Sequence, residues 1–185
     1  MKELLYGNRS MIACVCCYLA WWIITFRPPA PKGSLMGSVF LLGAFLFGVG
    51  GIFLIVHGII NMADKPVVNA FIPVWIIPVL GIIAYMVLLF VSANLFHRQV
   101  TSELFIIVGW TVLELCFVGT LYRYGAIGRG NPAAYITGII IVTVVCMVCY
   151  LLYYDLEYVK GYIDGMIPLI LTGVMMVIIN LGVRN

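Results

Sequence analysis

Charged residues are scarce in this sequence. Of its 185 residues only 9% are Asp, Glu, Lys or Arg, whereas 64% are hydrophobic. A soluble domain carries about 25% charged residues, so this chain has too little polar surface to cover a water-exposed globule. The shortage of charge excludes a soluble enzyme, a disordered tail and a nucleic-acid-binding module. It leaves an integral membrane protein with almost nothing outside the bilayer.

The motifs of common enzyme classes are also missing. The sequence has no phosphate-binding loop, dinucleotide-binding glycine motif, nucleophilic serine elbow or carboxylate cluster suited to a divalent metal. All six cysteines lie within apolar runs, including the Cys146-x-x-Cys149 pair, where a reactive thiolate is disfavoured. No Cys and His residues have zinc-ligand spacing. We therefore expect no cofactor and no metal, and a non-enzyme is favoured over an enzyme.

Long apolar runs are what the sequence does contain. A membrane-crossing helix needs about 20 apolar residues, and every break between the runs holds charges, Pro or Gly, which stop such helices. Continuous rather than alternating runs favour helices over a membrane barrel. The sequence predicts one all-α transmembrane domain over residues 1–185. This polytopic bundle has six helices at about 11–26, 34–60, 70–96, 102–122, 133–154 and 163–183.

The distribution of basic residues gives an orientation. If the N-terminus is cytoplasmic, six basic residues lie on that side and four on the other. This modest bias favours both termini in the cytoplasm, and we expect a plasma (inner) membrane location. No small-x-small cleavage site follows the first apolar run, so we expect it to be a retained helix rather than a signal peptide.

A faint internal repeat relates the two halves of the chain. Arg27 and Arg123 each end an apolar run and are followed, through prolines, by another run. The Ile-Pro pairs at Ile72-Pro73 and Ile167-Pro168 are separated by nearly the same number of positions as these two arginines. Two consecutive three-helix halves would be inverted in the membrane, an arrangement common in channels and transporters. The alternative is that the loops simply reuse Arg, Pro and Gly.

A stripe of small residues runs along the second predicted helix. Gly37, Ala44, Gly51 and Gly58 recur every seven residues, which keeps them on one helix face. Small residues allow a neighbouring backbone to come close. The stripe predicts a packing face, and we expect this helix to lie centrally in the bundle.

Glu114 is the most informative polar residue. It lies in the middle of the fourth predicted helix, and Trp110 and Thr111 share its face one turn earlier. A carboxylate at membrane depth is costly, so it should face the bundle interior, protonated or paired. It is either a proton- or cation-sensing group or solute contact, or a partner in an interhelical hydrogen bond to Asn, Thr or Tyr. The functional interpretation is favoured, because intramembrane acids are functional candidates by default.

His57 and Asn61 form a second candidate near the end of the second predicted helix. They are four residues apart and so lie on one face. Histidine titrates near physiological pH, which suits a gate or a proton-coupled step. An interfacial histidine that contacts headgroups or a backbone carbonyl is the equally weighted alternative. Further uncharged groups along a solute path, or between packed helices, are Tyr85, Asn94 and Asn180.

A tyrosine-rich and acidic segment precedes the last predicted helix. Tyrosines recur every four residues from Tyr150 to Tyr162. With Asp155, Tyr158 and Asp164, they could form an aromatic site for a cationic ligand. An interfacial aromatic belt explains the stripe more simply.

These residues support two functions. The first is a channel or transporter for an ion or small polar solute, proton-sensitive through Glu114 and His57. The second is a membrane-embedded binding or accessory subunit, or an intramembrane enzyme acting on a lipidic substrate. Expected partners are the lipid bilayer and a small solute or ion, not nucleic acid, and a homo-oligomer is compatible with both. The first function is favoured, because accessory subunits often carry docking elements outside the membrane.

Overall fold

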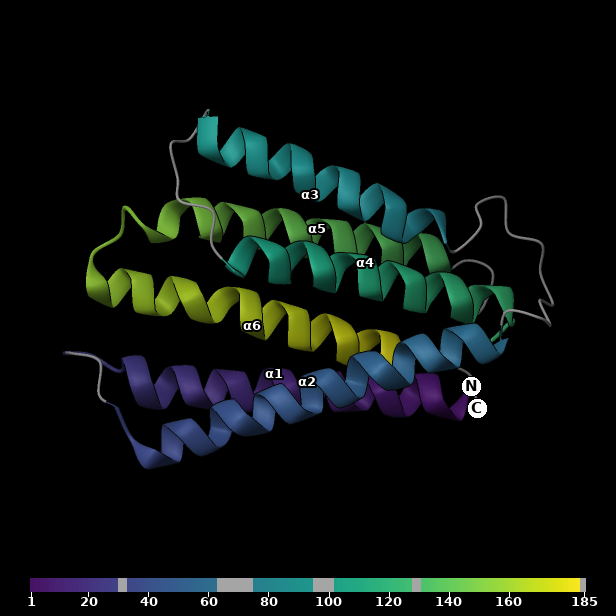
Figure 1. Ribbon diagram of the computed structural model, residues 1–185, viewed down its shortest axis with the longest axis horizontal. Coiled ribbons are helices and arrows are strands. Elements are labelled where there is room, and N and C mark those ends of the chain that lie inside the picture. Colours follow the sequence, from purple (N-terminus) through teal and green to yellow (C-terminus); the bar gives the residue numbers. More distant parts are fainter. Residues whose placement is uncertain (30–32, 63–74, 95–101, 128–130, 184–185) are drawn as a thin grey trace. The chain divides into compact units, whose positions relative to one another are not determined.

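The computed structural model describes residues 1–29, 33–62, 75–94, 102–127 and 131–183. Within these ranges the regular elements are all α-helices (Figure 1). They are α1 (Lys2–Phe26), α2 (Leu35–Met62), α3 (Ile76–Asn94), α4 (Ser102–Arg123), α5 (Asn131–Tyr153) and α6 (Tyr158–Leu181).

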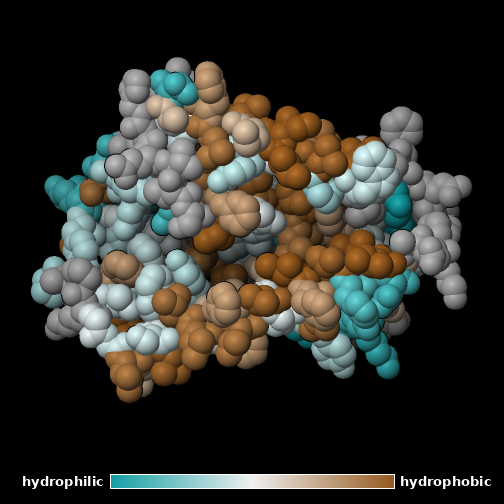
Figure 2. Space-filling model, in the orientation of Figure 1, coloured by the Kyte–Doolittle hydropathy of each residue, from teal (hydrophilic) through white to brown (hydrophobic). Residues whose placement is uncertain are grey.

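The predicted all-α class with six membrane-length helices is confirmed. All six helices are long and apolar enough to cross a bilayer. Large hydrophobic side chains point outward from them: Phe45 on α2 is 65% exposed and Phe90 on α3 is 70% exposed. Figure 2 shows brown, hydrophobic side chains along much of the visible face, with teal side chains mainly toward the helix ends. Such faces are suited to lipid, and they indicate a multi-pass integral membrane protein.

Two helices begin earlier than their apolar runs suggest. The first helix starts at Lys2 rather than near Met11, and the sixth starts at Tyr158 rather than near Ile163. The polar first turns of α1 are helical because they pack against a neighbour, with Leu4, Gly7 and Asn8 all buried. Packing of this kind extends a helix beyond the run that hydropathy alone defines.

Several predictions fall on residues outside the described ranges. Both ends of the third predicted helix, 70–74 and 95–96, are among them, as is the Ile72-Pro73 half of the predicted repeat. So are half of the basic residues that determine the orientation: Lys32, Lys65, Arg98, Arg129 and Arg184. The orientation of the termini and the inverted repeat therefore stay predictions.

The chain divides into two compact units. Unit 1 comprises Met1–Asp64 and Leu152–Val183 and so holds α1, α2, α6 and the end of α5. Unit 2 comprises Lys65–Leu151 with Arg184–Asn185, and holds α3, α4 and most of α5. These units combine helices from both ends of the chain, so they do not coincide with two consecutive three-helix halves.

In unit 1, α1 packs antiparallel to α2 along the predicted small-residue stripe. Gly37, Ala44, Gly51 and Gly58 are all buried, which confirms the packing face. Two glycines lie close together here: a methyl group added to Gly7 would lie 2.9 Å from the Gly51 carbonyl oxygen. Because no real Cβ atom comes so near a backbone oxygen, glycine is what allows the two backbones to meet.

The middle helix of unit 1 is α1, because it packs against both α2 and α6. On α6, Gly165 lies against the indole of Trp22, and an added Cβ on Gly173 would lie 3.3 Å from Val15 Cγ1. As positions on α1 fall, the contacted positions on α6 rise, so the pair is antiparallel. Small residues on α6 thus receive the larger side chains of α1.

Unit 2 is linked by hydroxyl groups as well as by apolar contacts. The Ser92 hydroxyl of α3 and the Tyr150 hydroxyl of α5 are 3.2 Å apart and buried. The hydroxyls of Thr111 on α4 and Thr143 on α5 are 2.8 Å apart. These two pairs connect α5 to each of the other helices in unit 2.

Candidate functional site

Glu114 lies in the interior of α4 and is completely buried, as the sequence predicts for its side chain. Neither carboxyl oxygen has a hydrogen-bond partner among the described residues. A buried polar group without a partner costs about 1–3 kcal/mol, and a charged one costs more. A carboxyl group in such a place is stable as a neutral acid or when it holds a cation.

Trp110 adds a second polar group to the same face. Its side chain is 7% exposed, and no described residue accepts a hydrogen bond from its Nε1. Buried tryptophan normally finds an acceptor for this N–H. Trp110 precedes Glu114 by one helical turn, so α4 presents an indole donor and a carboxyl group on one face. The two groups together could bind a small ion or polar solute.

Thr111, the third residue predicted on this face, has a structural role. Its hydroxyl lies 2.8 Å from the Ile107 carbonyl oxygen in its own helix and 2.8 Å from the Thr143 hydroxyl. Thr143 in turn approaches the Ile139 carbonyl oxygen at 2.8 Å. One hydroxyl donates to the other, which donates to its own helix, so both are fully engaged in joining α4 and α5.

Two other predicted path residues are also engaged locally. The Tyr85 ring of α3 packs edge-on against the Phe105 ring of α4, with centroids 5.7 Å apart. Asn94 is exposed and donates a hydrogen bond to the Phe90 carbonyl oxygen of its own helix. Neither side chain is brought to Glu114 by a described contact.

His57 and Asn61 meet a residue that the sequence does not point to. Glu3 Oε2 lies 3.1 Å from His57 Nδ1 and accepts a hydrogen bond of 3.2 Å from Asn61 Nδ2. The side chains of His57 and Glu3 are 48% and 46% exposed. This cluster belongs to unit 1 and Glu114 to unit 2, so the predicted path through both residues stays a prediction.

Asn8 is a completely buried amide that the sequence analysis misses. Among the described residues neither its Oδ1 nor its Nδ2 has a hydrogen-bond partner. The same holds for Nδ2 of Asn180 on α6, one of the predicted path residues. Asn8 lies seven residues before Val15, and Asn180 lies seven residues after Gly173, which contacts Val15. Because α1 and α6 are antiparallel, the two amides lie at the same height along the axes of this helix pair.

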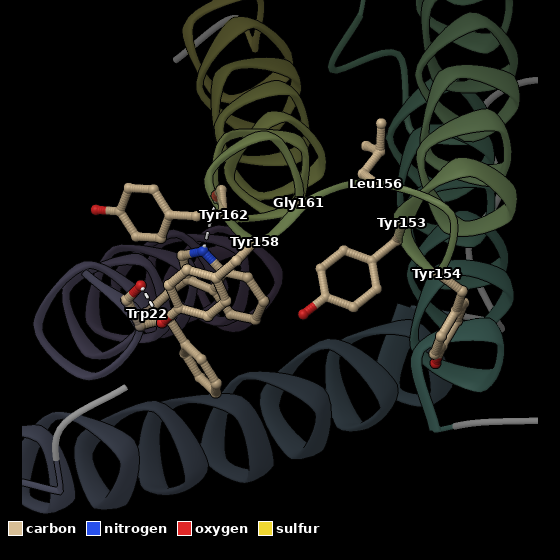
Figure 3. A pocket seen from close by; sticks show the side chains of 8 residues that line it. Trp22, Tyr153, Tyr154, Leu156, Tyr158, Gly161 and Tyr162 are labelled. Carbon is tan, nitrogen blue, oxygen red and sulfur yellow. Dashed lines mark hydrogen bonds between the residues drawn. The ribbon is translucent and has the colours of Figure 1, made fainter. Parts of the chain in front are cut away.

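An open pocket of about 240 Å³ lies in unit 1 where α1 ends and α6 begins (Figure 3). It contains Tyr158, one of the predicted outer residues. Asp155 is exposed in the connection between α5 and α6, and Asp164 is buried on α6; neither lines the pocket. The lining residues are Trp22, Phe26, Tyr153, Tyr154, Leu156, Tyr158, Gly161 and Tyr162.

The remaining candidates for metal or redox chemistry do not come together. In the part of the chain that the structure describes, no three His, Cys, Asp or Glu side chains form a metal-binding group. Cys146 and Cys149 are not joined by a disulfide, and both are buried in α5. Three features are therefore candidates for binding or chemistry. They are the face of α4 that carries Glu114, the Asn8–Asn180 level (the two amides at one height along α1 and α6), and the aromatic pocket.

Comparison with known proteins finds no matching family model, no matching curated protein and no matching solved structure. Any function must therefore be argued from the chemistry of these three features.

Proposed function

We propose that this protein is a small membrane channel or transporter for an ion or small polar solute, in which Glu114 binds and releases a proton or holds a cation. The observation that carries the proposal is the complete burial of Glu114 without a described hydrogen-bond partner. Ionisable groups inside membrane proteins are costly, and they mark ion and proton pathways.

The structural alternative for Glu114 was a hydrogen bond that holds two helices together. The described Asn, Thr and Tyr side chains offer it no such bond. The threonines nearest along the chain are engaged elsewhere: Thr111 with Thr143, and Thr120 with the Cys116 carbonyl oxygen. A buried carboxyl group without a hydrogen-bond partner among the described residues is more simply explained by function.

Each unit also contains other buried polar groups that have no hydrogen-bond partner among the described residues. The Trp110 indole N–H faces the same way as Glu114, while unit 1 contains the amides of Asn8 and Asn180. Groups of this kind replace the hydration of a solute or ion as it crosses the bilayer. Transport also agrees with a chain that consists mainly of membrane-length helices.

Flux through proteoliposomes tests the proposal. The purified protein is reconstituted into liposomes. From pH 5 to 8, proton flux is followed with a pH-sensitive dye inside, and uptake of Na⁺, K⁺, acetate and urea is followed with isotope-labelled solutes. We expect wild-type protein to carry at least one of these, and Glu114→Gln to slow that flux tenfold or more. Tenfold corresponds to about 1.4 kcal/mol, just below the range of about 1.5–3 kcal/mol that one hydrogen bond to a charged group contributes.

The matched control is Glu103→Gln. Glu103 lies in the first turn of the same helix and is exposed, so the same chemical change there should leave flux unchanged. His57→Gln should alter the pH dependence of flux by less than Glu114→Gln does. Wild-type flux from Glu114→Gln at every pH, or no flux of any probe through the wild-type protein, would contradict the proposal.

A second candidate function is a membrane-embedded binding or accessory subunit, or an enzyme acting on a lipidic substrate. The specific observation in its favour is the aromatic pocket around Tyr158. A lipid that copurifies with wild-type protein, and is lost on Tyr158→Ala, would support this candidate. A ligand-free preparation would count against it.

A further inference from the structure

The aromatic pocket is built from ring faces that approach from two sides. On one side the Trp22 and Phe26 rings of α1 pack with centroids 4.5 Å apart. Tyr153 extends from the end of α5 toward Trp22 and Tyr158 (Figure 3), and its ring centroid lies 6.1 Å from that of Trp22. The Trp22 and Tyr153 rings meet edge to face at an interplanar angle of 60°, so the rings that line the pocket lie at different angles rather than in a single flat belt.

Hydrogen bonds to the backbone hold two of these rings in place. Trp22 Nε1 donates to the Tyr162 carbonyl oxygen at 3.1 Å, and the Tyr158 hydroxyl donates to the Phe26 carbonyl oxygen at 2.9 Å (Figure 3). The polar tips of both side chains are thus already engaged. What they offer to a ligand is the π face, and it is preorganised before any ligand arrives.

The floor of the pocket leaves room for a ligand. Gly161 lines it, and a Cβ added there would lie 3.6 Å from Tyr153 Cε2. A larger side chain at position 161 would therefore grow into the space beside the Tyr153 ring. Glycine keeps that space open.

Acidic residues are frequent in the sequence around the pocket. Asp155, Glu157 and Asp164 are close by in the sequence, and Asp164 lies one turn along α6 from Gly161, on the same face. Of the two nearby basic residues, Lys160 is paired with Glu157 at 3.2 Å. The other, Arg27, follows Phe26 and is exposed. Aromatic faces attract organic cations, most strongly where water is partly excluded.

We infer that this pocket binds an alkylated ammonium group, carried either by a lipid headgroup or by a free solute. Trp22, Phe26, Tyr153 and Tyr158 supply the aromatic rings that line the site. This inference does not depend on Glu114 or on transport, because the pocket lies wholly within unit 1. It can hold or fail whether or not the protein carries a flux.

Choline and its neutral isostere 3,3-dimethyl-1-butanol separate a cation site from a merely apolar one. Binding of each to the full chain in maltoside micelles, which lack ammonium headgroups, is measured by calorimetry. Because several aromatic rings contribute to the attraction of a cation, choline should bind at least tenfold more tightly than the alcohol. Equal binding of the two compounds, or no binding of choline, would overturn the inference.

Variants of Tyr153 locate the site. Tyr153→Leu removes the facing ring and should weaken choline binding about fivefold or more. Tyr153→Phe keeps the ring and should bind within twofold of wild type, which also shows that position 153 tolerates change. The matched control is Tyr135→Leu at the other end of α5, which should leave binding unchanged. Equal weakening by Tyr135→Leu would overturn the location.

Nanodiscs distinguish the two sources of the ammonium group. If the occupant is a lipid headgroup, phosphatidylcholine in the disc should compete with free choline and lower its apparent affinity relative to discs of phosphatidylglycerol. If the occupant is a solute, the two discs should give the same affinity. Either result supports an ammonium site, whereas loss of choline binding in both discs would overturn it.

Discussion

Both compact units contain close glycine contacts, including Gly81 of α3 against Val112 of α4 in unit 2, but the described hydroxyl–hydroxyl pairs between helices both lie in unit 2. In unit 1 the α1 and α2 backbones meet at glycines, and Gly165 and Gly173 of α6 receive Trp22 and Val15 of α1. In unit 2 the described links between helices include the hydroxyl pairs Ser92–Tyr150 and Thr111–Thr143. Close glycine packing depends on shape alone, whereas hydroxyl pairs depend on bonding geometry. The units should therefore respond differently to added volume and to lost polarity.

The largest effect is expected from added volume in unit 1. A Cβ on Gly7 would lie 2.7 Å from Ile55 Cγ1 and 2.9 Å from both the Gly51 carbonyl oxygen and the Ile55 nitrogen. Two of these atoms are backbone and cannot move aside cheaply. Gly7→Ala should therefore lower the free energy of unfolding by about 2–3 kcal/mol, the upper part of the usual cost of overpacking.

Gly50 is the matched control for this substitution. It lies on α2 beside Gly51, but a Cβ added there meets no atom within 4 Å. Gly50→Ala should leave stability unchanged or raise it by up to about 1 kcal/mol, because alanine is the better helix former. Denaturant titration of both variants in micelles measures the difference. Equal effects at the two positions would show that α1 and α2 do not meet at glycine.

An effect of opposite sign is expected at Glu114 in unit 2. If its carboxyl group makes no bond in the fold, Glu114→Met removes an unpartnered buried polar group and keeps similar volume. Unfolding free energy should then rise by about 1–2 kcal/mol, while the flux proposed above is lost. A protein that is more stable and less active is the expected signature of a functional residue. Destabilisation would instead indicate a structural bond at Glu114.

Parts of this organisation follow directly from the sequence. The heptad spacing of Gly37, Ala44, Gly51 and Gly58 identifies the buried face of α2, because that spacing is a local property of one helix. Burial of Glu114 follows equally from the cost of exposing a carboxylate to lipid. Both predictions need only the sequence of a single helix and the fact that lipid surrounds the protein.

Other features depend on contacts that no local pattern encodes. The first turns of α1 are too polar for hydropathy to predict them as part of a membrane span. They are nevertheless helical, and Gly7 and Asn8 are buried there against other parts of the protein. Trp22 donates a hydrogen bond to Tyr162, which lies 140 positions later in the chain. The pocket, the Glu3–His57 contact and the Asn8–Asn180 level all require the pairing of α1 with other helices. Sequence periodicity does not specify that pairing.

The smallest effect is expected at the hydroxyl pair that distinguishes unit 2. Thr143→Val keeps the side-chain shape and removes the bond to Thr111, which can still donate to the Ile107 carbonyl oxygen. Because no polar group is left unpartnered, the free energy of unfolding should fall by only about 0.6 kcal/mol, the average for such bonds within membranes.

A double-mutant cycle of Thr111→Val with Thr143→Val should give a coupling energy of about this size. The same cycle with Thr120→Val, whose hydroxyl donates to its own helix at Cys116, should give none. Equal coupling in both cycles would mean that the 2.8 Å contact between α4 and α5 adds nothing beyond packing, and that the two units are stabilised by the same means.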